Sequence, residues 1–582
     1  MPTATDAGTR RARRRRAASP QHRDPADSVT PVAHAESEGR VTVGVSMAQI
    51  ARIVTGMLWL AWAASLSAMG YVPKAAVLQT VVAAVGLCVI GLAVTVRTET
   101  ARRRLDLFLI GGSIALVLVL PLAAAVAGGY VTDELAYDQA AAASLLHGIN
   151  PYTVDFTKAL QTYGVGAGAT MTLHGTVEAY LNYPALSFLL YAPAVAMLGP
   201  RSYAGLLVDL VAWGAAGFVM WRVLDARIRP WVPVLLTLPA LLGSVITGAT
   251  DSLFIPFELI ALCSWQRFGD PTVSRWWRWA GPISLGLACC VKQQPWFLVP
   301  FLLIAVAFEA RRRGLSPWRE LLRYAALVGV AFLVPNLPFI VWDPAAWFSR
   351  LLTPFTGGLV PMGIGPAGLL RPLAIGGGAL VLFAVAAAAT LIGTAALLCA
   401  RYDSMRRIIP LLPAITLFMS ARPFASYLTF CIPALVVNAA ALNAGSDVRS
   451  VRPHRSFLIV CAAAFVVGVS AAAGAFATSA PLRIAITGAK ADGSDVTLAV
   501  RVANLSSRTV TPHFFLARGM YYNQALTTVS GPATLSAGSE ATYEFSAVET
   551  PSTPHPGDSV QIQAGTLAPD TISTSAIAIV GG

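Results

Sequence analysis

The sequence has 582 residues, of which 55% are hydrophobic and only 12% are charged, and its mean hydropathy is +0.63. Together with repeated apolar runs of about 20 residues, this composition excludes a soluble enzyme and indicates a mainly α, polytopic helical membrane protein. The formal net charge of +13 does not indicate a nucleic-acid partner, because the Arg residues fall in short clusters between apolar runs, as in cytoplasmic loops.

The N-terminal residues 1–46 precede the first apolar run, which starts near Met47. They contain an Arg-rich run at 10–16 and then a stretch with Pro, Ser and Asp. Because no apolar core comes early, the sequence predicts no cleaved signal peptide but a disordered basic cytoplasmic tail. The Arg run either contacts anionic lipid headgroups or only fixes the orientation of the chain.

Apolar segments predict the membrane domain, residues 47–479. They span 47–69, 73–96, 105–127, 184–198, 203–222, 231–247, 251–266, 280–309, 321–342, 374–399, 407–420, 424–443 and 456–478. Placing the basic loops inside gives about 13 crossings, with the N-terminus cytoplasmic and the C-terminus outside. This count needs one net crossing over 184–222 and two short crossings over 280–309. In an alternative topology, 184–222 makes two crossings and 280–309 makes one, which places Arg227 and Arg229 outside.

The seven cysteines lie inside these apolar segments at no metal-ligand spacing, so we expect neither disulfides nor a zinc site. After residue 480 the composition changes, and alternating runs such as VTLAVRVANL, ATYEFSAV and DSVQIQAG appear between turn signals. Period-two alternation predicts a small extracytoplasmic all-β sandwich over 480–582. We interpret it as structural, with a carbohydrate-facing role as the alternative.

Two polar loops are expected outside the membrane, at 128–183 and 343–371. The first holds the densest set of acidic, His, Tyr and Asn side chains in the chain. In a short helix, Asp133 and Tyr137 would share a face. A carboxylate there can act as a general base on a hydroxyl, although an acidic helix N-terminus is an equal interpretation of Asp133 and Glu134.

This loop contains a run of residues made of Asp133, Tyr137, Ala141, Leu145, Leu146, Gly148, Pro151 and Tyr152, followed by Tyr183, Pro184 and Leu186. The run resembles the first outer loop of GT-C glycosyltransferases, above all that of bacterial polyprenyl-phosphate-mannose-dependent mannosyltransferases. The turn from Gly248 to Asp251 looks like the family's Gly-Gln-x-Asn turn, from which Ala249 and Asp251 depart. The break from Lys292 to Pro295 is similar to its Lys-x-x-Pro element. The resemblance covers roughly residues 105–443.

The resemblance implies an inverting hexosyltransferase of the plasma membrane. It would transfer a sugar, mannose in the leading interpretation, from a polyprenyl-phosphate carrier to a hydroxyl of a cell-envelope glycan or glycolipid. The catalytic Asp of the family maps onto Asp133, with Glu134 as its nearest substitute, and Tyr137, Tyr152 and Tyr183 map onto the substrate-binding region. No cofactor is expected beyond the donor itself, and a divalent metal requirement stays open. One carboxylate suffices, because cations can take up the charge of a leaving phosphate.

Four further side chains could meet such a substrate. Lys292 lies in an apolar run, where an ionisable residue is costly unless it is paired or functional. It is expected to contact a lipid phosphate, with snorkelling as the alternative. Arg422 suits bidentate phosphate binding or a helix-end anchor equally. His147 and His174 could bind phosphate or acceptor, but ordinary loop histidines are the preferred interpretation. For Asp251 and Glu258 we expect buried polar contacts to neighbouring helices.

Three other functions stay open at this point. A polyprenyl-phosphate-arabinose-dependent arabinosyltransferase would suit an outer sandwich domain. A transporter or flippase for a lipid-linked glycan would show intramembrane charges and two similar halves, and the sequence has no convincing internal repeat. A structural envelope protein would make the loop acids expendable.

Overall fold

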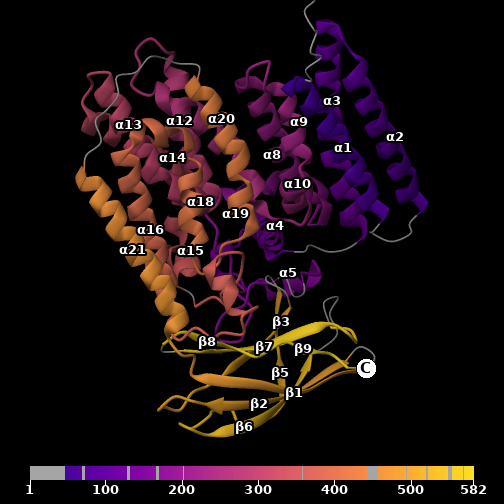
Figure 1. The fold of residues 1–582 in the computed structure, drawn as a ribbon, viewed down its shortest axis with the longest axis vertical. Coiled ribbons are helices and arrows are strands. Elements are labelled where there is room, and N and C mark those ends of the chain that lie inside the picture. The colour runs from indigo at the N-terminus through magenta and orange to yellow at the C-terminus, as the bar shows by residue number, and fades with distance from the viewer. Residues whose placement is uncertain are drawn as a thin grey trace, which may run out of the picture. The chain divides into compact units, whose positions relative to one another are not determined.

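The computed structural model describes residues 46–67, 73–127, 132–165, 169–200, 202–356, 358–443, 455–492, 495–518, 522–547, 554–567 and 569–581. The basic tail expected over 1–46 lies outside these residues, apart from Ser46. The chain is mainly helical up to Ala477 and forms β-strands after it (Figure 1). The predicted fold class, a polytopic helical protein with a small C-terminal β region, is confirmed.

The α-helices follow the apolar runs of the sequence. They are α1 (Met47–Ser67), α2 (Pro73–Thr95), α3 (Glu99–Ala127), α4 (Asp133–Leu146), α5 (Thr157–Thr162), α6 (Leu186–Leu189), α7 (Ala192–Leu198), α8 (Ser202–Val223), α9 (Val232–Thr237), α10 (Pro239–Ile246), α11 (Ile255–Ser264), α12 (Arg275–Val291), α13 (Val299–Arg312), α14 (Pro317–Trp342), α15 (Pro344–Thr356), α16 (Val381–Ala400), α17 (Tyr402–Met405), α18 (Leu411–Phe418), α19 (Ala425–Thr429), α20 (Cys431–Asn443) and α21 (Arg455–Ala477). Short 3₁₀ turns connect several of them: η1 (Pro151–Thr153), η3 (Arg229–Trp231), η4 (Thr250–Leu253), η5 (Trp265–Arg267), η6 (Gln294–Leu298), η7 (Pro366–Leu370) and η8 (Arg406–Ile408).

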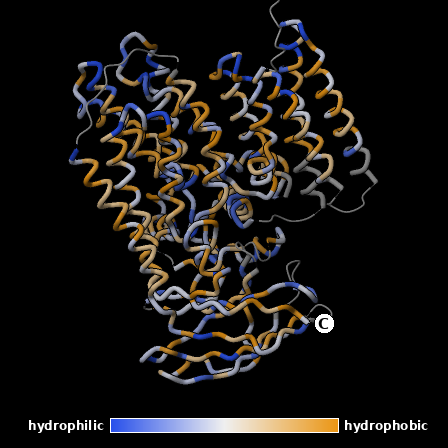
Figure 2. Tube along the Cα trace, in the orientation of Figure 1, coloured by the Kyte–Doolittle hydropathy of each residue, from blue (hydrophilic) through white to orange (hydrophobic). Residues whose placement is uncertain are grey.

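Within the described ranges, seven helical stretches are long and apolar enough to cross a membrane. The number rises to eight if the pair Arg229–Thr237 and Pro239–Ile246, bent by 49°, counts as one span. A multi-pass membrane protein is therefore confirmed, whereas the count of about 13 crossings stays a prediction. Figure 2 shows apolar residues along most of these helices and a mixed pattern in the strands.

Several predicted segments are broken into shorter helices. Residues 184–198 form α6 and α7, and 280–309 is divided where α12 ends at Val291. At that break Lys292 is extended, with φ −150° and ψ 158°, and Pro295 lies in the first turn of η6, which begins at Gln294. Proline has no backbone N–H and suits the first turn of a new helix rather than the middle of an old one. The break expected at Lys-Gln-Gln-Pro is confirmed, and it allows the Lys292 side chain to contact neighbouring elements.

The second polar loop contains a helix that the sequence analysis did not predict. Residues 344–356 form α15, which begins with Pro344 and is capped by Asp343, whose carboxylate accepts from the Ala346 N–H at 2.9 Å. Trp347 and Leu351 are buried on one face. The sequence predicted residues 343–371 only as a polar outer loop, but Pro at a helix start is compatible with helix. This helix brings Arg350 toward the first loop.

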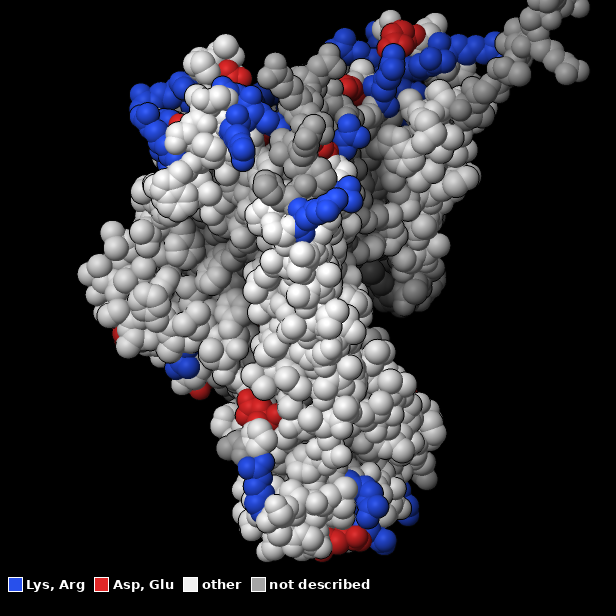
Figure 3. Space-filling model, turned by 60° about the vertical axis from the view of Figure 1, so that its left-hand side comes forward, with Lys and Arg blue, Asp and Glu red and all other residues white. Residues whose placement is uncertain are grey.

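Lys and Arg side chains gather over one end of the helices, while the surface over their middle is mostly uncharged (Figure 3). α13 ends there with Arg312, which is paired with Glu309 and Asp403, and Arg406 also contacts Glu309. α21 begins with Arg455 and leads into the first strand. The asymmetry is the one that the positive-inside rule describes for cytoplasmic helix ends.

The C-terminal strands form two antiparallel sheets. The strands are β1 (Leu482–Asp492), β2 (Asp495–Asn504), β3 (His513–Arg518), β4 (Tyr522–Ala525), β5 (Thr527–Ser530), β6 (Glu540–Ala547), β7 (Ser559–Thr566), β8 (Thr571–Thr574) and β9 (Ala578–Ile579). One sheet has the order β1-β2-β6-β5 and the other β4-β3-β7-β8, with β9 pairing to β7. Val500 and Phe545 of the first sheet share a core with Phe514 and Ile562 of the second. The three alternating runs singled out in the sequence are β2, β6 and β7.

Candidate functional site

The two candidate acids, Asp133 and Glu134, form the first turn of α4. Thr132 fixes the start of this helix, because its hydroxyl donates to the Gly248 carbonyl oxygen at 2.7 Å. Eight of the fourteen residues of α4 are buried, among them Asp133 and Tyr137. The short helix predicted here is confirmed, and protein rather than lipid surrounds most of it. Carboxylates in a first turn also favour the helix dipole.

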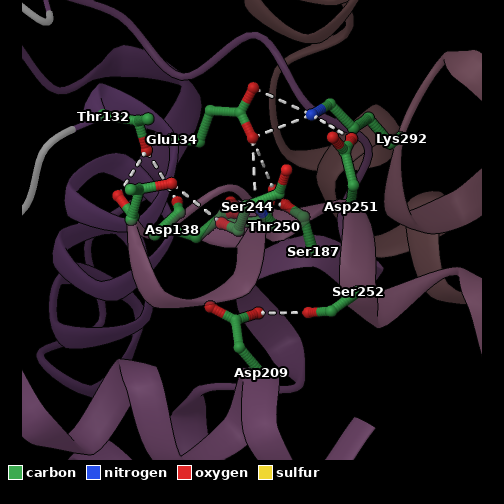
Figure 4. Close-up of polar contacts among 12 residues, drawn as sticks. Thr132, Glu134, Asp138, Ser187, Asp209, Ser244, Thr250, Asp251, Ser252 and Lys292 are labelled. Atoms are coloured by element: carbon green, nitrogen blue, oxygen red, sulfur yellow. Dashed lines mark hydrogen bonds and ion pairs between the residues drawn. The ribbon is translucent and has the colours of Figure 1, made fainter. Parts of the chain in front are cut away.

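Glu134 and Asp251 both point to the ammonium group of Lys292 (Figure 4). The Lys292 Nζ lies 2.8 Å from both carboxylate oxygens of Glu134 and 2.6 Å from Asp251 Oδ1. Glu134 Oε2 also accepts from the Thr250 N–H at 3.0 Å. We call Glu134, Asp251 and Lys292 the lysine cluster.

The lysine cluster is closed by aromatic rings and by burial. The Nζ of Lys292 lies 5.5 Å from the ring centre of Tyr183 and 5.7 Å from that of Tyr427. Lys292 is 3% exposed and Asp251 is fully buried. A cation so enclosed does not snorkel, and its donors already face two carboxylates. The buried polar contact expected for Asp251 is present, and a phosphate contact for Lys292 stays a prediction.

Asp133 faces a different set of groups, although it is the chain neighbour of Glu134. Its Oδ2 accepts from the Thr170 N–H at 2.7 Å, and its Oδ1 has no hydrogen-bond partner among the described residues. The Thr170 hydroxyl in turn accepts from Arg422 Nη2 at 3.0 Å. One residue of the first loop therefore joins the candidate base to a candidate phosphate ligand.

Arg350 is a further cation near this site that sequence reasoning missed. Its guanidinium lies 3.5 Å from the ring centre of Tyr180, a geometry typical of cation–π contacts. Within the described part of the chain, neither Arg350 nor Arg422 forms an ion pair, and the Nε of each is buried without a hydrogen-bond partner. We call Asp133, Thr170, Arg350 and Arg422 the arginine cluster.

Glu178 links the two arginines electrostatically. Burial raises the pKa of its carboxyl, and the charges of Arg350 and Arg422 oppose that rise. Its backbone N–H donates to the Thr170 carbonyl oxygen at 2.8 Å. The charges of both guanidinium groups thus act on one buried carboxyl, whose backbone bonds to Thr170. The only sequence signal for Arg350 was its position in the second polar loop.

The three tyrosines of the predicted site hold the first loop together. The Tyr137 hydroxyl donates to the Glu178 carbonyl oxygen, and the Tyr152 hydroxyl donates to that of Tyr183 at 2.9 Å. Tyr137 and Tyr152 are almost fully buried. In this structure they position backbone around the clusters, and a direct contact with substrate stays a prediction for all three.

The two predicted histidines lie apart from these contacts. His147 is exposed at the end of α4, where its Nδ1 is 2.7 Å from the Ala143 carbonyl oxygen. His174 is exposed as well, and its ring centre lies 6.3 Å from that of His513 in β3. Within the described residues, neither contacts the lysine or arginine cluster, in keeping with ordinary loop histidines.

A second buried carboxyl, that of Asp138, lies one turn further along α4. It accepts from the Ser187 hydroxyl at 2.6 Å (Figure 4), and its other oxygen has no hydrogen-bond partner in the described part of the chain. Burial raises the pKa of Asp138 to about 8. An acid that is buried without an ion pair is more stable when protonated.

The comparisons with known proteins add little to this geometry. No family model matches the sequence, and no curated protein matches it either. Among solved structures, ArnT from Cupriavidus metallidurans bound to undecaprenyl phosphate is similar at a TM-score of 0.37 and 16% identity, covering 58% of this chain and 60% of that chain. ArnT in the apo state gives a TM-score of 0.35 and 17% identity with the same coverage. The chain thus spans less than two thirds of the ArnT chains that it matches, and likeness at this level establishes neither a shared fold nor a shared activity.

Proposed function

We propose that this protein is a membrane glycosyltransferase that transfers a sugar from a polyprenyl-phosphate carrier to an acceptor hydroxyl. The observation that carries the proposal is the arginine cluster. It combines a carboxylate oxygen of Asp133 that has no hydrogen-bond partner among the described residues with two guanidinium groups that form no ion pair there, although the charges of both act on the nearby Glu178 carboxyl. Sugar transfer from a phosphate carrier needs one base and cations for the leaving group.

The proposed roles follow from these charges. The acceptor hydroxyl gives its proton to Asp133 as its oxygen attacks the anomeric carbon. The new carbon–oxygen bond forms on the face opposite the phosphate, the bond to the phosphate oxygen breaks, and the carrier leaves as a phosphate monoester. Arg350 and Arg422 would bind that phosphate, since guanidinium suits bidentate contact with it. A glycosidase would instead need two carboxyl groups flanking the scissile bond.

Asp133 is a better candidate for the base than its neighbour Glu134. Both oxygens of Glu134 contact Lys292, and one also accepts from Thr250. A carboxylate held in this way has its proton-accepting positions occupied. The lysine cluster would then fix the first turn of α4, while Asp133 meets the acceptor.

We further propose that the donor sugar is mannose, with arabinose as the alternative, and that the acceptor is a cell-envelope glycan or glycolipid. The site would face the outside of a plasma membrane, with the N-terminus in the cytoplasm. What supports the sidedness is the gathering of Lys and Arg over the helix ends where α13 ends and α21 begins (Figure 3).

The test is turnover by the purified full-length protein in lipid nanodiscs. Synthetic polyprenyl-phosphate mannose and polyprenyl-phosphate arabinose would be offered with envelope glycan and glycolipid acceptors. Asp133→Asn should lower kcat by about 100-fold or more, as loss of a general base does. The matched control is Asp155→Asn, because Asp155 is an exposed acid of the same loop.

The control should keep kcat within about twofold, as surface substitutions usually do. Wild-type turnover with one donor and loss only in the Asp133 variant would support the proposal. Equal turnover in all three proteins would remove Asp133 from the mechanism. No turnover with any donor and acceptor would reject the proposed function.

A further inference from the structure

We infer that the C-terminal β region positions the arginine cluster by clamping the hairpin 169–178, which carries Thr170. The importance of this contact for catalysis rests on the proposed function, but the positioning of the hairpin by the β region does not. The hairpin is closed by a bridge between Met171 and Val177 and by the hydrogen bond from the Glu178 N–H to the Thr170 carbonyl oxygen. The hairpin, a segment of the second polar loop and the β strands are in contact.

The hairpin first pairs with the second polar loop. The Leu173 N–H donates to the Gly358 carbonyl oxygen at 2.7 Å, and the Val360 N–H donates to the Met171 carbonyl oxygen at 2.9 Å. These bonds extend the hairpin by one strand-like segment. The position of Thr170 therefore depends on where residues 358–360 lie.

The β strands then cover the hairpin from the other side. Gly565 in β7 lies against Leu173 so closely that a Cβ at this position would be 2.9 Å from the Leu173 carbonyl oxygen. Phe515 of β3 and Ile572 of β8 share an apolar cluster with Met171 and Leu173. Backbone of the hairpin thus contacts backbone of a sheet, a contact that leaves little freedom.

The β strands also hold the loop that carries the pairing segment. Arg371 Nη2 donates to Asn523 Oδ1 at 2.6 Å, and Gln561 Nε2 donates to the Arg371 carbonyl oxygen at 2.9 Å. Gly377 and Ile572 exchange two backbone hydrogen bonds, at 2.8 and 3.0 Å. The chain that follows the pairing segment 358–360 is therefore tied to the β region at Arg371 and Gly377.

The same loop supports Arg422 from its other side. The Met362 N–H donates to the Ala421 carbonyl oxygen at 3.2 Å, and the Ile364 N–H donates to the Pro423 carbonyl oxygen at 2.8 Å. Thr170 and Arg422 thus reach each other through segments that the β region holds. The candidate base Asp133 and Arg422 are 289 residues apart in the chain, yet both contact Thr170. The β region, through the segments that it holds, therefore acts as a brace that positions both residues.

The test is amide-resolved hydrogen exchange of the full-length protein in nanodiscs without substrate. Gly565→Ala should speed exchange of the Thr170 amide by about tenfold, because overpacking against backbone forces a shift. Gly488→Ala is the matched control. A Cβ at Gly488 in β1 would meet only the Ala499 Cβ at an ordinary 3.5 Å, so exchange at Thr170 should not change.

Phe515→Ala is the second variant, since it removes packing rather than adding it. Asp133→Ala alone should also speed exchange at Thr170, because the acceptor of that N–H is lost. If the brace positions the pair, adding Asp133→Ala to Phe515→Ala gives little further acceleration, whereas a general loss of stability would leave the two effects additive.

Unchanged exchange at Thr170 in both Gly565→Ala and Phe515→Ala would overturn the inference. A variant whose β2 amides lose protection while residues 169–178 keep their protection would also overturn the inference. Faster exchange in 169–178 would support it where the double variant shows little further acceleration, and additive acceleration would contradict it. Because no substrate is used, these outcomes stand apart from any failure of the turnover assay.

Discussion

Asp133 and Glu134 are adjacent in the chain, yet they belong to two clusters with opposite charge balance. In the lysine cluster, two carboxylates meet one ammonium group, and Lys292 and Asp251 are buried. In the arginine cluster, one carboxylate reaches two guanidinium groups only through Thr170 and its neighbours, and the buried Nε of each arginine has no hydrogen-bond partner among the described residues.

This difference separates a cluster that stabilises the fold from a cluster that binds a ligand. A buried ammonium group that faces two carboxylates stabilises one arrangement of helices, even though Asp251 Oδ2 has no hydrogen-bond partner among the described residues, and removal of one charge is costly. Buried donors without partners are costly as they stand, unless a ligand completes them. We therefore assign the lysine cluster to the scaffold and the arginine cluster to the substrate, and the variants below test that division.

The largest effect is expected from Lys292→Met. It leaves Glu134 and Asp251 facing each other in a buried place without their cation, which should cost about 3–5 kcal/mol of unfolding free energy. Thermal denaturation in detergent would measure the loss. Adding Glu134→Gln and Asp251→Asn should restore much of it, because no buried charge then remains.

The matched control is Arg501→Met, which breaks the exposed ion pair with Glu540 on the β region. Exposed pairs contribute about 0–1 kcal/mol, so the midpoint should hardly move. Equal midpoints for Lys292→Met and the control would show that the lysine cluster does not hold the fold.

A smaller effect is expected from Arg350→Met and Arg422→Met, and on binding rather than on stability. Each removes a charged donor to the carrier phosphate, worth about 1.5–3 kcal/mol, or about 10- to 100-fold in Kd. Binding of a synthetic polyprenyl phosphate to the purified variants would measure it. Arg311→Met, at an exposed position near the end of α13, serves as the control. Wild-type affinity in both cluster variants would move the anion site elsewhere.

The sequence predicted more of the site's members than of their contacts. Asp133 and Arg422 were candidates from the residues and the resemblance, and the structure brings them to the same threonine. The sequence could not predict that Glu134 and Asp251 enclose Lys292. Pairing across 158 and 41 positions is set by helix packing and not by a local sequence pattern. Arg350 was missed because the residues of α15 were predicted only as part of a polar outer loop.

The fold was predictable where one local rule dominates. Long apolar runs such as 456–478 became single helices, here α21, and period-two runs became strands. Broken segments were harder, because α6, α7 and α18 are stabilised by neighbours rather than by length. The contact between the hairpin 169–178 and β7 had no sequence signal, since the glycine that permits it, Gly565, looks like any other strand glycine.

The most direct test of the division compares Asp133→Asn with Glu134→Gln in one preparation, measuring kcat per folded molecule and the midpoint of thermal denaturation. The account predicts that Asp133→Asn loses about 100-fold or more in kcat with little change in the midpoint. It predicts that Glu134→Gln lowers the midpoint and keeps most of the turnover of the folded fraction. The reverse pattern, with turnover lost only in Glu134→Gln, would contradict the assignment of Asp133 as the base.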